Sequence, residues 1–588
     1  MAGLMLLAGC GQSSAPTSTQ STADVRGKPN VLIILADDVG YSDISTFGSE
    51  IQTPNLDELA RDGQLLTNFH TTPLCATSRV ELLTGADHHL VGMGEMGSMK
   101  LLYLGTQNPN YAAQFDPRGL SIAQMLKDAG YHTYMAGKWG IGGVGPQGEG
   151  FEHAFYLDKA ADYASNFAPP ANYTPGLLAI NPPYPMYEPH FEDGKQVAKL
   201  PDDFFSSDNY TSKLIHYIGE DHGDGKPFFA YLPLQATHFP LQAPAQYLDC
   251  VKGAPKCYKG VYDVGYDAIR NARIQRMKDL GIIPQDFKPS PGDEVTMTRF
   301  GQPGVLTNTS WSALSASDKQ SEARIMEVYA AMLTNLDDNV GRVIDYLKSI
   351  GEYRNTMIVF LSDNGADGMG YGFIPFVDSN GNTDINNALS NYGRPGSFIF
   401  RSTRWAEVGT APFRLFKSFP AEGAISVPTI VKMPNGPPLV PTGAYAQLQD
   451  IVPTVLALAG VAPPGNHYEG RAISPIEGTS LLPMLEWRAT SVHAPDQVFA
   501  DEVAAQRYVR QGQWKMTRIA NYFFPSAALL LPRQWQLYNI DTDRGETHDV
   551  AAENPQEVQK LTQEWQQYAA RVDAVNPTIL PPLVPITQ

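Results

Sequence analysis

Two uninterrupted apolar segments, each followed by acidic residues, constrain the fold of this chain most strongly. Val31–Ala36 is apolar throughout and is followed by Asp37-Asp38, and Met357–Leu361 is apolar and is followed by Ser362-Asp363-Asn364. A strand that is apolar on both faces belongs in the middle of a sheet that helices cover on both sides, and such sheets are largely parallel. The sequence therefore predicts a covered, mostly parallel sheet with polar residues at the ends of two strands.

Helical and strand patterns alternate along most of the remaining chain. Helices are predicted at 54–61, 120–129, 321–350 and 451–459, and further strands at 131–136, 228–232 and 428–432. This alternation predicts the α/β class, with a large central, mostly parallel sheet flanked by helices. The segments 145–221 and 370–407 are expected to be loops that decide substrate choice.

The pattern changes beyond about Leu485. A hairpin at 508–516, a strand at 535–538 and a helix at 558–570 predict a smaller C-terminal α+β subdomain with an antiparallel sheet and a helix. We expect three parts: residues 1–27 as a signal and tether, 28–485 as the catalytic α/β domain, and 486–588 as the C-terminal subdomain.

The N-terminus has the features of an export signal. Leu4–Cys10 resembles the end of a bacterial lipoprotein signal, and Gly11–Gly27 is a Ser-, Thr- and Gln-rich tether. We therefore expect a periplasmic or cell-surface protein with a lipid anchor at Cys10, although a slightly apolar N-terminus without function is the alternative. Cys250 and Cys257 are close enough in sequence to form a disulfide in an oxidising compartment, or are two free thiols.

The balance of charges excludes one class of partner. With 43 basic and 61 acidic residues the formal net charge is −18. A nucleic-acid-binding protein needs a basic surface, so no nucleic-acid partner is expected. A small anionic substrate is still compatible, because a few basic side chains in a pocket dominate at short range.

The two acidic strand ends predict a metal site. In an open α/β sheet ligands bind beyond the carboxyl ends of the strands, where Asp37, Asp38, Asp363 and Asn364 would meet. Three crowded carboxylates repel one another or take up protons unless a cation neutralises them. Oxygen ligands favour Ca²⁺, with Mg²⁺ as the less favoured choice. Taken alone, Asp37-Asp38 would be an ordinary helix cap.

A cysteine lies at the start of a short predicted helix. Cys75 precedes Ala76-Thr77-Ser78-Arg79, so backbone N–H groups would stabilise an anion at Cys75, and Arg79 would face the same point one turn later. A buried cysteine that serves only as a small apolar side chain is the alternative.

Several motifs together resemble the sulfatase family, in its arylsulfatase branch within the alkaline phosphatase superfamily. The motifs occur in the family's order and extend from about Lys28 to Ala570: Asp37-Asp38, Thr53–Asp57, Cys75–His89, Gly137-Lys138-Trp139, Thr237–Pro244, Ser362–Gly365, Ala411–Lys417 and Arg544–Asp549. The resemblance implies an enzyme that hydrolyses a sulfate ester of an aryl or carbohydrate alcohol.

The resemblance also implies residue roles. Cys75 would be converted to formylglycine by a formylglycine-generating or radical maturation enzyme, and its hydrate would ligate the cation and attack sulfur. Arg79, Lys138 and Lys417 match the family's sulfate and aldehyde clamp, and His238 matches the histidine that assists departure of the alcohol. The metal ligands would be Asp37, Asp38, Asp363, Asn364 and the modified Cys75.

Two positions depart from the family pattern. Thr77 stands where the family has a proline that helps the maturation enzyme, and Gly140 stands where it has a histidine that contacts the hydrated aldehyde. Without that histidine, three outcomes are compatible with the sequence: His132 or a water substitutes for it, turnover is slow, or the substrate differs. The glycine-rich run 140–143 indicates a backbone that approaches another group closely.

Two other functions are compatible with the same motifs. The first is a phosphonate monoester or phosphodiester hydrolase on the same scaffold, and the second is a non-catalytic homologue that binds sulfated glycans. His88-His89 resembles a metal pair, but adjacent side chains rarely share one ion, so we expect structural roles for both.

Overall fold

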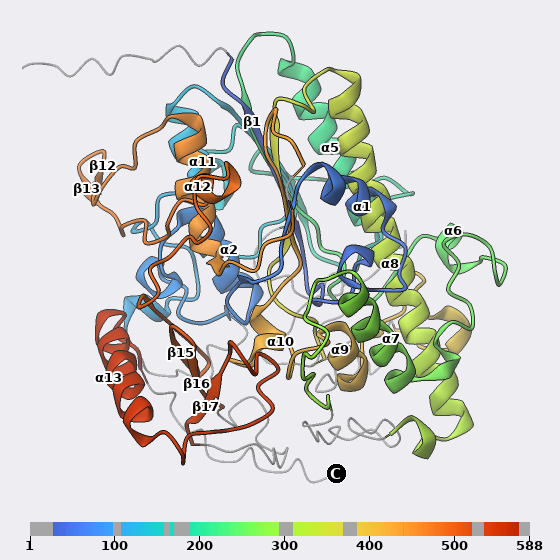
Figure 1. Cartoon of the computed structure of the whole chain (residues 1–588). Helices are drawn as coiled ribbons and strands as arrows, with labels where there is room; N and C mark the ends of the chain where they lie inside the picture. The colour runs from blue at the N-terminus through green and yellow to red at the C-terminus, as the bar shows by residue number, and fades with distance from the viewer. Residues whose placement is uncertain are drawn as a thin grey trace, which may run out of the picture.

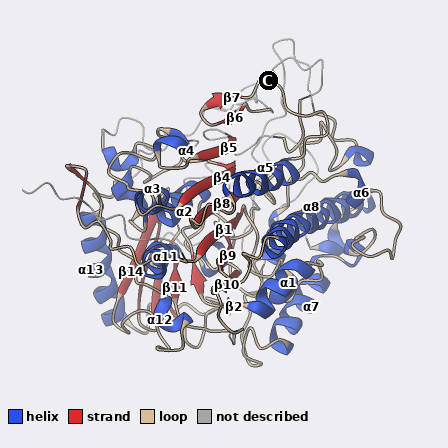
Figure 2. Ribbon diagram, turned by 90° about the horizontal axis from the view of Figure 1, so that it is seen from above, coloured by secondary structure: helices blue, strands red, loops and turns tan. Residues whose placement is uncertain are grey.

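The chain folds around one large sheet with helices on both faces (Figures 1 and 2). The computed structural model describes residues 27–97, 107–157, 165–169, 187–292, 310–368, 385–438, 440–519 and 534–575. Cys10, the N-terminal signal, most of the tether and parts of both predicted substrate loops lie outside these residues. Among the described residues, no helix has the length and apolar character needed to cross a membrane.

The central sheet has nine strands in the order β2-β10-β9-β1-β8-β4-β5-β6-β7. Strands β9, β1, β8, β4 and β5 pair in parallel, and the strands at the two edges are antiparallel. The predicted mostly parallel sheet is thereby confirmed. The strands are β1 (Asn30–Ala36), β2 (Gln64–Leu66), β4 (His132–Lys138), β5 (His153–Leu157), β6 (His190–Glu192), β7 (Lys195–Gln196), β8 (Phe228–Pro233), β9 (Thr356–Ser362) and β10 (Thr429–Lys432).

Successive residues of β1 pack into two separate hydrophobic cores, because side chains alternate between the faces of a strand. Leu32 and Ile34 belong to one core, and Val31, Ile33 and Leu35 belong to the other. Every residue of β1 is buried, which explains its continuous apolar sequence. On the first face lie α1 (Pro54–Asp62), α5 (Ser206–Asp221), α6 (Ala245–Leu248), α7 (Tyr266–Asp279) and α8 (Ala316–Ser349), as Figure 2 shows. Helix α9 (Thr403–Gly409) contributes Trp405 and Val408 to the core on the same face.

The opposite face of the sheet carries the helix that begins at Cys75. Figure 2 shows α2, α3, α4, α11 and α12 on this side. Their bounds are Cys75–Thr84 for α2, Ile122–Asp128 for α3, Gly145–Gly148 for α4, Ile451–Ala459 for α11 and Leu482–Leu485 for α12, while α10 spans Glu422–Ile425. Short strand pairs are formed by β3 (Phe69–His70) with β11 (Ala446–Gln447) and by β12 (His467–Tyr468) with β13 (Arg471–Ala472).

A second sheet of four antiparallel strands follows in the C-terminal part of the chain, as the sequence predicts. Its strands are β14 (Val498–Val503), β15 (Gln506–Gln511), β16 (Trp514–Arg518) and β17 (Gln536–Asn539), and α13 (Pro555–Arg571) covers one face. A buried ion pair connects this sheet to α10, since Lys515 Nζ lies 2.8 Å from Glu422 Oε1 of α10. The same Nζ also lies 2.8 Å from Glu546 Oε1.

The prediction that 145–221 consists of loops is wrong at α4, β5, β6, β7 and α5, which all lie within this range. Strand β5 joins the central sheet, and α5 packs against β4 and α8. The buried side chains of α5 include Tyr210, Leu214, Tyr217 and Ile218, which have helical spacing. Two of these four are tyrosines, so the segment looks polar when only aliphatic residues are counted as core.

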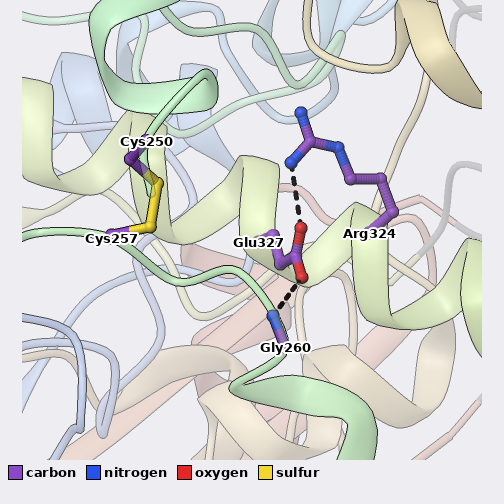
Figure 3. Close-up of a disulfide and its surroundings, with 5 residues drawn as sticks. All are labelled: Cys250, Cys257, Gly260, Arg324 and Glu327. Atoms are coloured by element: carbon purple, nitrogen blue, oxygen red, sulfur yellow. Dashed lines mark hydrogen bonds and ion pairs between the residues drawn. A yellow bond between two sulfur atoms is a disulfide. The ribbon is translucent and has the colours of Figure 1, made fainter. Parts of the chain in front are cut away.

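Cys250 and Cys257 form a disulfide with a Cα–Cα distance of 5.5 Å, which decides between the two alternatives left open by the sequence. Figure 3 shows this disulfide beside α8. A few residues on, the Gly260 N–H donates to Glu327 Oε1 of α8 (2.7 Å), and Arg324 pairs with the other oxygen of this carboxylate (2.9 Å). The disulfide therefore closes a loop in a segment that is hydrogen-bonded to α8.

Candidate active site

The two acidic strand ends lie side by side. Strands β1 and β9 pair in register, with Ala36 opposite Ser362. The N–H of Asp363 donates to Ala36 O (3.0 Å), and the N–H of Asp38 donates to Asp363 Oδ1 (3.2 Å). Asp38 has a φ of +65°, a left-handed conformation that few side chains adopt. All three carboxylates are completely or almost completely buried.

Cys75 faces this pair of strand ends. It is the first residue of α2 and is only 1% exposed. Ligand-type atoms of Asp37, Cys75 and Asp363 lie within 4.8 Å of one another, and those of Asp37, Asp38 and His238 form a second such group. The structure thus brings the proposed nucleophile to the two acidic strand ends that flank it in space but not in sequence.

Three buried basic side chains surround the carboxylates. Arg79 donates to Asp363 Oδ2 through Nε (3.0 Å) and Nη2 (2.8 Å), and to Lys138 O through Nη1 (2.8 Å). Lys138, the last residue of β4, donates from Nζ to Asp37 Oδ2 (2.7 Å). Lys417 Nζ lies 2.8 Å from Asp38 Oδ1. The charges of the three bases therefore balance those of the three carboxylates.

His238 is a buried residue beside Asp38. Its Nδ1 is 2.6 Å from Phe239 O, and because a carbonyl only accepts, Nδ1 carries a proton. Its Nε2 is directed at Asp38, 3.6 Å from Oδ2. The hydrogen bond to Phe239 thus fixes the ring so that Nε2 faces the cluster. We refer to Asp37, Asp38, Cys75, Arg79, Lys138, His238, Asp363, Asn364 and Lys417 together as the strand-end cluster.

The carboxylates of the strand-end cluster have strongly perturbed acidities. Burial works to raise the pKa of Asp37, but Lys138 and Arg79 outweigh it and hold this pKa below its ordinary value. Burial and the neighbouring Asp37 raise the pKa of Asp363 to about 7. Burial likewise raises the pKa of Asp38 above its ordinary value despite Lys417. Asp38 and Asp363 thus hold a negative charge less readily than ordinary carboxylates, mainly because they are buried.

Two buried oxygen atoms of the strand-end cluster have no hydrogen-bond partner among the residues that the structure describes. They are Asp37 Oδ1 and Asn364 Oδ1. The amide nitrogen of Asn364 donates to Asp38 Oδ1 (2.6 Å), which orients its oxygen away from that carboxylate. A buried acceptor without a donor costs about 1–3 kcal/mol, and a cation would satisfy both oxygens. The donor set, made of carboxylate and amide oxygens, fits Ca²⁺ or Mg²⁺.

The structure corrects the expectation for His132. His132 is the first residue of β4 and Lys138 is the last, so the two lie at opposite ends of this strand. His132 pairs with Glu152 and Asp224 at 2.9 Å each, far from the strand-end cluster. It therefore cannot replace the histidine that the family has at the position of Gly140.

The glycine-rich run after Trp139 has two different environments. A Cβ at Gly143 would lie 2.6 Å from Phe115 O, which confirms the predicted close approach of the backbone. A Cβ at Gly140 would meet only Lys138 (3.4 Å) and Arg79 (3.8 Å), at ordinary contact distances. Position 140 thus borders the strand-end cluster without being crowded. At the other departure from the family pattern, the buried Thr77 hydroxyl donates to Leu74 O (2.8 Å).

Sequence reasoning missed two charged residues at the site. Asp367 Oδ2 lies 3.8 Å from Lys417 Nζ, and Arg401 reaches Asp38 O (3.4 Å). Asp367 follows Asn364 by three residues, a signal that could have been used, whereas no pattern marks Arg401. A cavity of about 10 Å³ opens above Asp38, and its lining is completed by Thr237, Phe239, Leu241, Asp367, Phe400 and Arg401.

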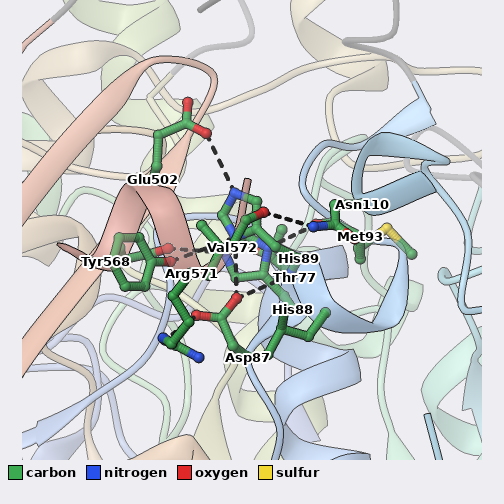
Figure 4. Close-up of polar contacts among 12 residues, drawn as sticks. Thr77, Asp87, His88, His89, Met93, Asn110, Glu502, Tyr568, Arg571 and Val572 are labelled. Carbon is green, nitrogen blue, oxygen red and sulfur yellow. Dashed lines mark hydrogen bonds and ion pairs between the residues drawn. The ribbon is translucent and has the colours of Figure 1, made fainter. Parts of the chain in front are cut away.

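His88 and His89 lie in a different buried cluster, between α2 and the C-terminal sheet (Figure 4). His88 contacts Met93 O (2.7 Å) and Asp501 Oδ1 (2.8 Å), and His89 contacts Asp87 Oδ1 (3.1 Å) and Glu502 Oε2 (3.4 Å). All four ring nitrogens therefore have protein partners, which agrees with the structural role we expected. We call these five side chains, Asp87, His88, His89, Asp501 and Glu502, the histidine clamp.

Comparison with known proteins defines the class to which this fold and site belong. The structure of Ps i-CgsB in complex with k-i-k-neocarrahexaose aligns with a TM-score of 0.59 and 21% identity over 92% of this chain and 93% of that chain. The structure of BT4656 with D-glucosamine-2-N,6-O-disulfate aligns with a TM-score of 0.57 and 19% identity, covering 94% and 99%. These two alignments show that the chain shares the fold of these proteins.

Sequence comparison then gives the family. The family model described as Sulfatase matches residues 29–461, and the chain belongs to this family. An uncharacterised sulfatase of Schizosaccharomyces pombe is 36% identical over 93% of this chain and 95% of its own length. An arylsulfatase of Klebsiella aerogenes is 35% identical, covering 77% and 91%. The protein is a sulfuric ester hydrolase.

Proposed function

We propose that the strand-end cluster hydrolyses a sulfate monoester with a nucleophile derived from Cys75 beside a single Ca²⁺. The observation that carries the proposal is a pair of buried oxygens without a partner among the described residues, Asp37 Oδ1 and Asn364 Oδ1, in a cluster where Asp37 and Asp363 lie within 4.8 Å of Cys75. Asp37, Asp38, Asp363, Asn364 and the modified Cys75 would hold the cation. When bound, the cation would supply positive charge that lowers the pKa of a neighbouring hydroxyl and polarises the sulfate.

The charges of the cluster support an anionic substrate. Asp37, Asp38 and Asp363 are balanced by Arg79, Lys138 and Lys417, so a divalent cation would leave a net charge of about +2 in a buried site. A sulfate monoester carries one negative charge, and more charge develops on its oxygens as the ester bond breaks. Fixed positive charges that match this development lower the barrier to reaction.

The proposed nucleophile is formylglycine, produced from Cys75 by a maturation enzyme. Its hydrate supplies one hydroxyl for attack on sulfur and a second hydroxyl that allows sulfate to be released. Arg79 is oriented for this role by three hydrogen bonds to Asp363 and Lys138 O. Lys138 and Lys417, which lie against Asp37 and Asp38, are the two flexible cations near enough to bind the sulfate oxygens.

His238 is proposed to help the alcohol leave. Its Nε2 faces the cluster, and Nδ1 is held by Phe239 O. A protonated Nε2 would donate to the bridging oxygen as the bond to sulfur breaks, which matters most for poor leaving groups. The leaving alcohol would then extend toward the cavity lined by Phe239, Leu241 and Phe400.

Gly140 keeps a second candidate function open, namely phosphonate monoester or phosphodiester hydrolysis on the same scaffold. The family histidine at this position is absent, and the structure provides no replacement from His132. A site with fewer groups around the nucleophile is less specialised for sulfate. Names among the relatives, such as arylsulfatase and N-acetylgalactosamine-6-sulfatase, favour the sulfate ester.

Two measurements test the proposal together. Tryptic mass spectrometry of the Cys75 peptide should show the mass of formylglycine, and steady-state assays should show higher kcat/KM for an aryl sulfate than for the matched aryl phosphonate. An unmodified thiol with no hydrolysis would contradict the proposal, and a preference for the phosphonate would select the second function.

We also propose that the protein is exported and anchored through Cys10. The Cys250–Cys257 disulfide supports this location, because such bonds persist in oxidising compartments. Fractionation of the native host followed by detection of a lipidated Cys10 peptide would test the proposal, and a protein found only in the cytosol would contradict it.

A further inference from the structure

A second buried network lies directly beneath the strand-end cluster, centred on the carboxylate of Asp43. Its Oδ1 accepts from Arg273 Nη1 (2.6 Å), and its Oδ2 accepts from Arg401 Nη1 (2.8 Å) and the Tyr329 hydroxyl (2.7 Å). Asp43 is completely buried. Burial works to raise the pKa of Asp43, but Arg401 and Arg273 outweigh it and hold this pKa below its ordinary value. Asp43 is therefore a fixed anion.

One side of this network holds the loop that carries two of the proposed metal ligands. Asp43 Oδ2 also accepts from the Gly40 N–H (2.9 Å), two residues after Asp38. Arg401, held by Asp43, reaches the carbonyl oxygen of Asp38 at 3.4 Å. Since Asp38 has a left-handed backbone, these contacts to its carbonyl oxygen and to the Gly40 N–H stabilise a conformation that would otherwise be unfavourable.

The other side of the network holds the loop that carries His238. The Thr237 N–H donates to Asp37 O (2.6 Å), and the Thr237 hydroxyl lies 3.2 Å from the Tyr329 hydroxyl and 3.3 Å from Asp37 O. Because Tyr329 donates its proton to Asp43, its oxygen is an acceptor for the Thr237 hydroxyl. A single tyrosine of α8 thus joins the Asp43 carboxylate to the residue directly before His238.

We propose that Tyr329, acting through Asp43 and Thr237, is a positioning residue that sets His238 relative to the loop of Asp37 and Asp38. The inference rests on the proposed role of His238 in the departure of the alcohol. Tyr329 is almost completely buried, 1% exposed, and it contacts neither proposed ligand oxygens nor the cavity above Asp38. Its ring lies under Arg401, 3.8 Å from the guanidinium, so the ring and the hydroxyl have separable functions.

The same network offers a matched control. Tyr262 is equally buried, and its hydroxyl donates to Glu50 Oε1 (2.9 Å), a carboxylate that pairs with Arg273. Tyr262→Phe therefore removes a buried tyrosine–carboxylate hydrogen bond from the same set of charges without touching Thr237. A loss caused only by weakened packing or charge balance should be similar in Tyr329→Phe and Tyr262→Phe.

The experiment compares two substrates that differ in leaving group, 4-nitrophenyl sulfate and phenyl sulfate, and uses full-length protein normalised for formylglycine content. Loss of help to the leaving alcohol harms the poorer leaving group more. We expect Tyr329→Phe to lower kcat for phenyl sulfate about 10-fold more than for 4-nitrophenyl sulfate, with little change in KM. Tyr262→Phe should lower the melting temperature similarly and leave the ratio of the two kcat values unchanged.

Two further variants keep the test decisive. Thr237→Val removes the hydroxyl that donates to Tyr329 and should reproduce the larger loss of kcat for phenyl sulfate. Thr237→Ser keeps this hydroxyl and should show the wild-type ratio of the two kcat values. His238→Ala defines the full size of the leaving-group effect. If His238→Ala shows the effect and Tyr329→Phe does not, the positioning role is wrong while the proposed function stands. If His238→Ala shows none, the proposed role of His238 fails, and the inference fails with it.

Discussion

The strand-end cluster and the histidine clamp are alike in the proximity of their potential metal ligands, but they differ in how far these ligands already have protein partners. Each brings at least three potential metal ligands within 4.8 Å of one another in a buried place. In the strand-end cluster, two ligand-type oxygens have no partner among the described residues. In the clamp, Asp87, His88 and His89, which form the close group, use every ligand-type atom in protein contacts, including Arg571 Nη2 on Asp87 Oδ2 (3.1 Å). Only Asp501 Oδ2, outside that close group, has no partner among the described residues of the clamp.

The difference shows that proximity of ligand-type residues is weak evidence for a metal, whereas unsatisfied acceptors are stronger evidence. A cation at the clamp would have to displace hydrogen bonds that already exist. A cation at the strand-end cluster would supply interactions that are missing. The clamp instead joins the helical face around α2 to β14 and α13 (Figure 4). The predictions that follow test this division of roles.

The largest effect is expected for Asp37→Asn. The variant keeps the shape of the side chain but removes a charge from the strand-end cluster, so kcat/KM should fall by about 1,000-fold or more and bound calcium should be lost. Elemental analysis and steady-state kinetics measure both. The matched variant in the clamp, Asp501→Asn, should keep the calcium content and kcat. Loss of calcium in Asp501→Asn would break the comparison.

Removal of the metal comes next. Dialysis against a chelator should lower activity by at least about 100-fold, and added Ca²⁺ should restore it more fully than Mg²⁺. Circular dichroism should change little, because the sheets and the clamp do not depend on the ion. Full activity in chelated protein, with no calcium by elemental analysis, would argue against the proposed metal site.

The histidine clamp should instead affect how the free energy of unfolding depends on pH. Burial works to lower the pKa of His89, but hydrogen bonds to Asp87 and Glu502 raise it from 6.5 to about 9. A raised pKa in the folded state stabilises the protein below the unfolded value, and this contribution disappears as pH rises through the folded value. It should amount to on the order of 3 kcal/mol, present below about pH 6.5 and lost above about pH 9.

Urea unfolding of the wild type and of His89→Asn, at several pH values across this window, measures the contribution directly. The difference in unfolding free energy between the two proteins should shrink as pH rises. A constant difference would mean that the pKa of His89 is the same in the folded and the unfolded protein.

The smallest effect is expected for Gly140→Ala at the border of the strand-end cluster. Gly140 has a φ of +71°, so a side chain costs about 1 kcal/mol of stability, although its Cβ would meet Lys138 and Arg79 at no less than 3.4 Å. Activity should stay within about twofold of the wild type, because no atom is displaced. A loss of activity much larger than this would show that the cluster needs the space at position 140.

The features that the sequence predicted best are the central strands and the polar residues that directly follow them. The apolar runs of β1 and β9 made their central place in the sheet predictable, and with it the meeting of Asp37 and Asp363. Helix α8 was predictable from its long amphipathic pattern, which the structure shows over Ala316–Ser349. The position of a residue along its strand was harder to predict. The expectation that His132 replaces the family histidine was wrong because His132 lies at the opposite end of β4 from Lys138.

Residues that act across several segments were not predictable from the sequence. Arg401 precedes α9 in a stretch without a strand or helix pattern, yet it contacts both Asp43 and Asp38 O. Helix α5 was missed because tyrosines supply much of its buried face. Both failures have the same physical origin, because tertiary packing and not local sequence gives these side chains their partners.

The burial of Cys75 has a consequence for the order of events in the life of the protein. With 1% of its surface exposed, this thiol is closed off once β1, β9 and α2 have assembled. An enzyme that converts Cys75 must therefore reach it while the polypeptide is still open, in competition with folding. If Cys75 is the proposed precursor of the nucleophile, a chain that folds first would retain an unconverted thiol, and the active fraction of a preparation would depend on which of the two processes is faster.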